Sequence, residues 1–277
     1  MRLTFAVAVL SALISCSPPA AQLQDGGASQ PIELRVMTFN IRAGNGDLDG
    51  IARVIRDAAP DIVGLQEVDV HFSSRSGFVD QASTLAGALE MEVRFAHIYE
   101  LEPDSAGRPP RRYGVAMLSR YPVLEFRNHE LHRLSTVEEE PAPRPRTGFL
   151  EAILDVEGTR VRFFNTHLDY RPDPALRTTQ VEETLAILGE TRMPTLLIGD
   201  LNARPDAAEL QPLLAFLHDA WRDQPAPGHT FPSDAPDRRI DYILHSDHFE
   251  VQRVEVLETT ASDHRPVVAD LVMTHVE

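Results

Sequence analysis

The stretch TLLIGDLN, residues 195–202, places two polar side chains directly after a short run of large apolar residues. Such a run is typical of a buried β-strand, because a strand that is covered on both faces shows no polar alternation. Asp200 and Asn202 follow at the point where this strand would end. Polar groups at strand ends can meet at one edge of a sheet, so this stretch predicts a functional site at a sheet edge.

Five further polar clusters lie beside or within strand-like runs elsewhere in the chain. Each brings Asn, Asp, Glu or His to a position where a strand begins or ends. A single carboxylate in such a position is more often a helix cap or a turn former. Six clusters together predict one site, and oxygen-rich ligands suit Mg²⁺ or Mn²⁺ better than zinc or copper. The five other clusters are Phe39-Asn40, Gln66-Glu67, Asn165-Thr166-His167, Asp241, and Ser262-Asp263-His264.

The remaining pattern predicts a mixed α/β layered domain. Helical periodicity covers residues 47–58, 79–89, 175–188 and 207–217, whereas the stretches 133–147 and 225–236 are rich in turn residues. Strands and helices alternate, yet several strand pairs are close enough in the chain to form hairpins, which argues against a purely doubly wound sheet. The expected strands are 32–39, 61–66, 113–119, 149–156, 161–166, 195–198, 240–244, 251–257 and 267–272.

The charge balance restricts the partners of this protein. The 277 residues carry a formal net charge of −16, and the chain contains no lysine, so all 26 basic residues are arginine. A protein that binds nucleic-acid backbones tightly normally presents a basic face. We therefore expect no high-affinity nucleic-acid binding. An acidic balance remains compatible with a metal site, since hard cations prefer carboxylates.

The N-terminus predicts export. Met1-Arg2 precedes an apolar run over residues 3–14 that is too short to span a bilayer and has the length of a signal-peptide core. The run ends in Leu13-Ile14-Ser15-Cys16, which resembles the lipobox of bacterial lipoproteins. We interpret 1–15 as a signal peptide, 16–31 as a lipidated Cys16 with a flexible tether, and 32–274 as the catalytic domain. The alternative is an ordinary secretory signal with an incidental cysteine.

Over about residues 33–273 the sequence resembles the endonuclease/exonuclease/phosphatase family. The resemblance implies an α/β (α+β) fold of four layers, in which two mixed β-sheets pack face to face with helices outside, as in deoxyribonuclease-like proteins. It also places the active site at one edge of this sandwich. The matching stretches are residues 38–41 (TFNI), 65–68 (LQEV), 114–120 (GVAMLSR), 165–168 (NTHL), 199–202 (GDLN), 239–242 (RIDY) and 262–266 (SDHRP).

The resemblance further implies a role for each site residue. Glu67, Asn40 and Asp263 would hold a divalent cation, Mg²⁺ or alternatively Mn²⁺. His264 would pair with Asp241 and act either as a base toward water or as a cation on the phosphate. The remaining catalytic candidates are Asp200, which would orient or deprotonate water, and Asn202 and His167, which would bind phosphate oxygens.

Several other residues are weaker candidates. Tyr113 either faces the site or has a packing role, and Arg111, Arg112 and Arg146 could reach a substrate phosphate, although exposed arginines are usually solvated. Trp221 is expected in the core.

We therefore expect a metal-dependent phosphoesterase that hydrolyses a lipid-linked or small phosphodiester outside the cytoplasm. It would be monomeric and held at a membrane surface by its lipid anchor. Two alternatives remain: an extracytoplasmic nuclease that degrades DNA or RNA, and a non-catalytic binding lipoprotein, which the presence of every site residue disfavours.

Overall fold

The structure, a computed structural model, describes residues 31–190 and 192–273. The predicted signal peptide, Cys16 and all of the predicted tether except Pro31 lie outside the described residues, so these remain predictions. Within the described ranges, no helix has the length and apolar character needed to cross a membrane.

Two β-α-β units determine the directions in which the central strands run. β1 (Ile32–Asn40) is followed by α1 (Leu48–Ala58) and then by β2 (Ile62–Val70), which runs parallel to β1. In the same way α3 (Ala175–Leu188) connects β7 (Thr159–His167) to the parallel β8 (Thr195–Asp200). A crossover helix allows a strand to return in the same direction. The carboxyl ends of each strand pair therefore lie at the same sheet edge.

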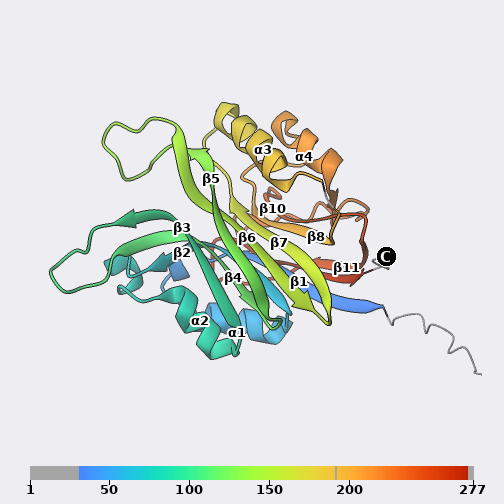
Figure 1. Cartoon of the computed structure of the whole chain (residues 1–277), viewed down its shortest axis with the longest axis horizontal. Coiled ribbons are helices and arrows are strands. Elements are labelled where there is room, and N and C mark those ends of the chain that lie inside the picture. Colours follow the sequence, from blue (N-terminus) through green and yellow to red (C-terminus); the bar gives the residue numbers. More distant parts are fainter. Residues whose placement is uncertain (1–30, 191, 274–277) are drawn as a thin grey trace, which may run out of the picture. The chain divides into compact units, whose positions relative to one another are not determined.

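The described strands form two mixed sheets of six strands (Figure 1). The first sheet has the order β11-β12-β1-β2-β4-β3, and the second has the order β5-β6-β7-β8-β10-β9. All neighbouring pairs other than β1–β2 and β7–β8 are antiparallel. The other strands are β3 (Glu92–Leu101), β4 (Arg111–Ser119), β5 (Val123–Arg133), β6 (Arg144–Val156), β9 (His218–Asp219), β10 (Asp241–His245), β11 (Phe249–Val256) and β12 (Val267–Met273).

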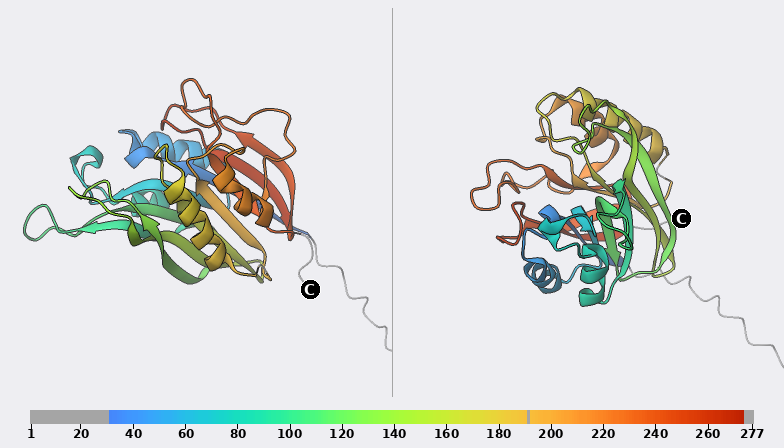
Figure 2. Two further views of the ribbon diagram at one scale, coloured as in Figure 1. Left: turned by 90° about the horizontal axis from the view of Figure 1, so that it is seen from above. Right: turned by 90° about the vertical axis from the view of Figure 1, so that its left-hand side faces the viewer.

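Side chains alternate between two apolar layers along each central strand. In β1, Leu34 and Val36 lie in the core that also contains residues of the second sheet, whereas Met37 and Phe39 belong to a cluster shared with α1 and α2 (Gln81–Leu89). A third cluster lies between the second sheet and the helices α3 and α4 (Gln211–Phe216). Figure 2 shows the two helix pairs on opposite outer sides of the sheets. The predicted four-layered sandwich of two mixed sheets is confirmed.

The same alternation brings polar groups into the space between the sheets. Successive side chains of a strand point to opposite faces, so every second residue shares a face. Asn40 thus continues the row of Leu34 and Val36, and His167 continues the row of Phe163. Asp200 shares a face with Ile198, and Asp241 shares one with Ile243. The apolar rows that form the inter-sheet core therefore end in the predicted site residues.

Buried amides join the two sheets next to this polar edge. Asn165 of β7 donates from Nδ2 to Leu65 O (2.9 Å) and to Ala116 O (2.8 Å), both in the first sheet. Its Oδ1 accepts a hydrogen bond from Gln66 Nε2 at 2.7 Å. A Cβ added to Gly64 would lie 2.4 Å from Ile198 Cδ1, so the sheets approach too closely here for a larger residue. The amide contacts therefore set the separation of the sheets where the site begins.

Most of the predicted elements are present, but the polar edge strands were missed. β3 and β5 lie at sheet edges and carry many polar residues, so neither shows a clear apolar alternation. The predicted loop 133–147 is shorter than expected, because β5 ends at Arg133 and β6 begins at Arg144. The predicted helix 207–217 consists of a 3₁₀ turn, Ala208–Leu210, followed by α4; the other 3₁₀ turns are Arg42–Gly44 and Ser74–Ser76.

We predict that Asn165→Leu destabilises the protein by about 2–4 kcal/mol. The substitution keeps the side-chain size but removes three buried hydrogen bonds, those of Asn165 with Leu65 O, Ala116 O and Gln66 Nε2. Each contributes about 0.5–1.5 kcal/mol net, and Gln66 Nε2 keeps its contacts with Thr38 Oγ1 and Gly64 O. Urea denaturation measures the change. Gln211→Leu is the control, because this exposed amide exchanges its hydrogen bonds with water. An equal, small effect of both substitutions would contradict the role of Asn165.

Candidate active site

Asn40 connects the two sheets at the site. Its Nδ2 donates to Asp200 Oδ2 of the second sheet at 3.0 Å and to Glu67 Oε1 of the first sheet at 3.1 Å. Its Oδ1 accepts from the backbone N–H of Arg42 at 3.1 Å. Asn40 is fully buried, so these hydrogen bonds are shielded from water. Its amide thus fixes the position of two of the predicted site carboxylates relative to each other.

Glu67 lies on a β-bulge rather than after the end of a strand. The sequence predicted a second strand over residues 61–66, but β2 continues to Val70 with a register shift between Leu65 and Val68. The backbone of Glu67 has φ +56°, a left-handed conformation that is strained for a residue with a side chain. A bulge re-aims side chains. Among the described residues no basic group forms an ion pair with Glu67, so its carboxylate is available to a cation.

Asp241 and His264 form a buried pair next to Asp200. Asp241 lies opposite Asp200 in the antiparallel β10–β8 ladder. His264 Nδ1 is 3.0 Å from Asp241 Oδ2, and His264 Nε2 is 3.8 Å from Asp200 Oδ2. The Phe231 ring packs against His264 at 4.7 Å between centroids. One imidazole thus lies between two buried carboxylates.

The charges of this group favour a protonated histidine. Burial disfavours the imidazolium, but the carboxylates of Asp241, Asp200 and Asp263 outweigh this effect and raise the pKa of His264 to about 10. Burial, and then the neighbouring Asp241, raises the pKa of Asp200 to about 6, against the lowering influence of His264 and His167. At neutral pH His264 therefore carries the proton, and Asp200 has a pKa suited to accept one.

His167 and Asn202 complete the second-sheet side of the site. His167 Nε2 lies 3.5 Å from Asp200 Oδ2, because the two residues are paired in the parallel β7–β8 ladder. Asn202 has φ +52°; its backbone N–H donates to Asp200 Oδ1 at 2.9 Å, and its Nδ2 donates to Leu168 O at 3.0 Å. Both side chains are partly exposed, so they are accessible to a substrate.

The loop before β12 closes the first-sheet side. Ser262 Oγ donates to Asn40 O at 2.7 Å, which fixes the loop that carries Asp263 and His264. Asp263 is partly exposed and pairs with Arg42 at 3.4 Å. Ser262 belonged to one of the polar clusters and to a matching stretch but had no predicted role of its own, and Phe231 had none. The contact of Phe231 with His264 has no signal in the local sequence, since 33 positions separate them.

The weaker candidates have partners elsewhere. Arg112 pairs with Glu100, Arg111 donates to Glu102 O, and Arg146 pairs with Glu138. Tyr113 stacks on Tyr99 at 5.9 Å between ring centroids. These contacts neither assign nor remove a role in substrate binding, so the roles remain predictions.

The donor set fits a hard cation. Glu67 supplies a carboxylate without a basic partner, and Asp263 is partly exposed beside the loop that contacts Asn40. A second group, Asp200, Asp241 and His264, offers ligand atoms that all lie within 4.8 Å of one another. A cation held by that group would have to displace the proton on His264. We therefore favour the Glu67 side for a cation and the buried group for acid–base chemistry.

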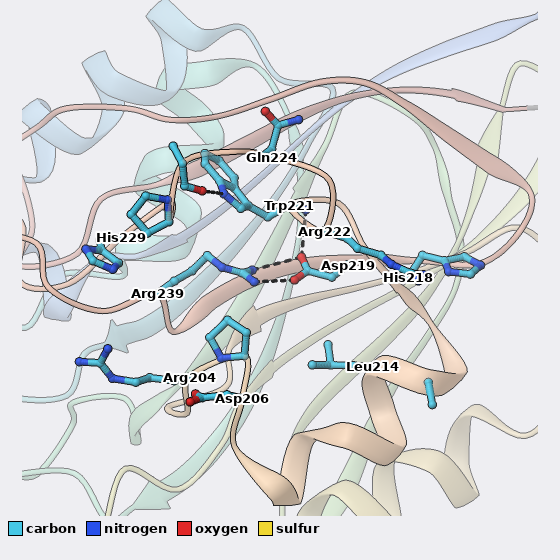
Figure 3. Close-up of a pocket in the computed structure, with 14 residues that line it drawn as sticks. Arg204, Asp206, Leu214, His218, Asp219, Trp221, Arg222, Gln224, His229 and Arg239 are labelled. Atoms are coloured by element: carbon cyan, nitrogen blue, oxygen red, sulfur yellow. Dashed lines mark hydrogen bonds and ion pairs between the residues drawn. The ribbon is translucent and has the colours of Figure 1, made fainter.

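A large cavity, drawn in Figure 3, has none of the predicted site residues in its lining. Its volume is about 720 Å³, and the lining includes Arg204, two residues after Asn202, and Arg239, two residues before Asp241. Arg239 forms a buried ion pair with Asp219 at 2.6 Å. Trp221, which was expected in the core, is partly buried and lines this cavity.

The comparison with family models decides the classification. Residues 37–264 match the model described as "Endonuclease/Exonuclease/phosphatase family". The chain belongs to this family. Members of the endonuclease/exonuclease/phosphatase family are hydrolases that act on phosphoester bonds and are generally dependent on divalent metal ions. Comparison with curated proteins gives no match.

Solved structures of the endonuclease/exonuclease/phosphatase family share the fold. A member from Beutenbergia cavernae DSM 12333 is 29% identical with a TM-score of 0.72, and the match covers 88% of this chain and 72% of that one. The mannosyl-6-phosphatase of Bacteroides thetaiotaomicron VPI-5482 is 21% identical (TM-score 0.65; 87% and 100% covered). The human Nocturnin catalytic domain with bound sulfate is 21% identical (TM-score 0.64; 88% and 94% covered).

We predict that His264 makes stability depend on pH. Its folded pKa is raised above the ordinary value of about 6.5, so its contribution is fully present below that pH and is lost as pH rises toward 10. The free energy of unfolding should be higher for the wild type than for His264→Gln, and this difference should fall between pH 6.5 and 10. Urea denaturation in chelator measures this difference, and a pH-independent difference would contradict the assignment.

Proposed function

We propose that this protein is a divalent-metal-dependent phosphoesterase that hydrolyses a small or lipid-linked phosphodiester outside the cytoplasm. The observation that carries the proposal is the buried row Asp241–His264–Asp200 next to the unpaired carboxylate of Glu67. A histidine held in its charged form, a carboxylate with raised pKa and a cation-binding carboxylate are the groups that phosphoester hydrolysis requires.

The residues of the chain divide the chemistry between them. Protonated His264, oriented by Asp241 through Nδ1, presents its Nε2–H to a non-bridging phosphate oxygen. Asp200 accepts the proton of the attacking water, and Asn40 and the Asn202 backbone N–H hold its carboxylate in place. His167 and the Asn202 side chain donate to phosphate oxygens as negative charge develops.

Glu67, Asn40 and Asp263 would hold the cation. A bound Mg²⁺ or Mn²⁺ polarises the phosphate and neutralises charge on the leaving oxygen. Asn40 directs its amide nitrogen toward Glu67, so its amide must turn over before its oxygen can become a ligand. In the orientation described here Asn40 positions Glu67.

Size and charge support a small substrate. The cavity of about 720 Å³, whose lining includes Arg204 and Arg239, falls within the range of about 300–1,000 Å³ that is usual for small-molecule sites. The net charge of −16 disfavours a long nucleic-acid backbone. The lipobox-like residues 13–16 support export and anchoring at a membrane surface, where a lipid-linked phosphodiester is accessible.

We predict metal-dependent hydrolysis of bis(p-nitrophenyl) phosphate and of one of the lipids sphingomyelin and phosphatidylinositol. Activity should disappear with chelator, and Asp200→Asn should lower kcat by about 10²–10⁴-fold because the base is lost. Asp49→Asn, which changes an exposed carboxylate, is the control. Plasmid DNA and RNA belong to the same panel. Rapid plasmid nicking without lipid turnover would defeat the proposed substrate class, and unchanged activity of Asp200→Asn would refute the base.

We also predict the shape of the pH profile. Asp200 must be deprotonated to accept a proton, so kcat/KM should rise with pH up to about pH 6. His264 must stay protonated, so activity should persist into the alkaline range and fall near pH 10. Asp241→Asn removes the main carboxylate partner of His264 and should move the alkaline limb to lower pH. An alkaline limb that does not move would show that another group controls it.

A further inference from the structure

A second, much smaller cavity has His167 in its lining and shares no lining residue with the large one. Its volume is about 80 Å³, and its walls come from β3, β4, the end of β5 and the residues that follow β7. Tyr99, Tyr113, Arg133 and His167 are among its lining residues. None of the roles assigned above involves a group bound in this cavity.

The small cavity borders the reaction centre on two sides. His167 lines it and is also 3.5 Å from Asp200 through Nε2. Tyr113 lines it from β4, where it pairs with Asp69, two residues beyond Glu67 on β2. A group in this cavity would therefore lie next to a phosphoester that contacts His167.

Arg133 is the unusual member of the lining. Only 6% of it is exposed, yet no carboxylate of the described chain forms an ion pair with it. Nη1 donates to His167 O at 2.7 Å and Nη2 donates to Gly148 O at 3.0 Å, whereas the buried Nε has no partner. Burial lowers the pKa of Arg133 to about 10, so the guanidinium is still charged at neutral pH.

The nearest acidic groups have partners of their own. Asp169 also lines the cavity, but its carboxylate accepts from the side chain and the backbone N–H of Arg171. Glu183 binds the ring and the backbone N–H of His132. A buried charge without a direct counter-ion is costly, and such a charge beside a cavity indicates an anionic ligand.

We propose that this cavity binds a second anionic group of the substrate, a phosphate or a carboxylate next to the scissile phosphoester, with the Arg133 guanidinium as its counter-charge. This proposal rests on the proposed phosphoesterase function. The volume of about 80 Å³ is large enough for one oxyacid group. The cavity thus favours substrates that carry a negative charge at one fixed position relative to the scissile phosphoester.

The competing explanation is structural. Arg133 could serve only to tie the end of β7 to Gly148 through its two hydrogen bonds. The two explanations predict different substrate preferences. If Arg133 recognises charge, the enzyme prefers a substrate with a remote negative charge over an uncharged one; if its role is purely structural, it does not.

The test uses p-nitrophenyl ethyl phosphate and matched esters in which a chain of two to four carbons ends in a phosphonate or a carboxylate. The phosphonate cannot be hydrolysed, so every turnover reports the diester. We expect kcat/KM of the wild type to be at least about tenfold higher for one charged series, mainly through KM, as one charge-assisted hydrogen bond would give. The two series distinguish phosphate from carboxylate. An equal kcat/KM for charged and uncharged esters overturns the proposal without any variant.

Substitution assigns the preference to the residue. Arg133→Gln should bring the ratio of charged to uncharged ester close to one, and Arg133→Lys should retain part of it. Arg127→Gln is the matched control, because Arg127 is an exposed arginine on the same strand. A preference that survives in a folded Arg133→Gln protein overturns the proposal. If that variant does not fold, as judged by circular dichroism, the ratio in Arg133→Lys decides.

Failure of the proposed function is distinguishable from failure of this site. If no ester is hydrolysed with Mg²⁺ or Mn²⁺, the phosphoesterase proposal fails. Calorimetric titration of the full chain with ethylphosphonate in chelator then measures anion binding to the cavity directly. Binding that weakens about tenfold or more in Arg133→Gln and less in Arg133→Lys, but not in Arg127→Gln, supports the anion site. Absent or unchanged binding refutes it.

Discussion

The separation of two β-sheets at their polar edge is the constraint on which the site depends. Glu67 and Asn40 belong to one sheet, and Asp200, Asp241 and His167 belong to the other. Their hydrogen bonds form only if the sheets are held at a fixed distance. Asn165 sets this distance by donating to two carbonyls of the opposite sheet, and Gly64 permits the close approach. A hydrophobic core alone is non-directional and would not specify the spacing to this accuracy.

The alternation of side chains between the two faces of each strand explains why the candidate site was largely predictable. Apolar rows that point into the inter-sheet core end in Asn40, His167, Asp200 and Asp241, so the pattern that buries the core also aims these groups. Two crossover helices then bring the strand ends to one edge. The sequence motifs therefore predicted the convergence. The edge strands β3 and β5 were not predicted, because their polar residues interrupt the apolar alternation that marks a strand.

Other features lie beyond local sequence reasoning because they arise from tertiary contacts. The bulge that carries Glu67 is defined by pairing with β4, which residues 61–70 alone do not reveal. The burial of Arg133 depends on carbonyls supplied by two other segments. The charged state of His264 depends on carboxylates 23 and 64 positions away in the chain. Each of these features modifies the chemistry of the site without changing the motifs that identify it.

The central claim is that groups from both sheets form one centre that holds a divalent cation and a phosphate together. Crystals soaked with Mn²⁺ and tungstate, recorded with anomalous scattering at both metal edges, test it most directly. We predict a manganese peak at the carboxylate of Glu67, with tungstate oxygens in contact with His264, His167 and Asn202. Manganese away from Glu67, or tungstate bound on a different face of the protein, would contradict this account.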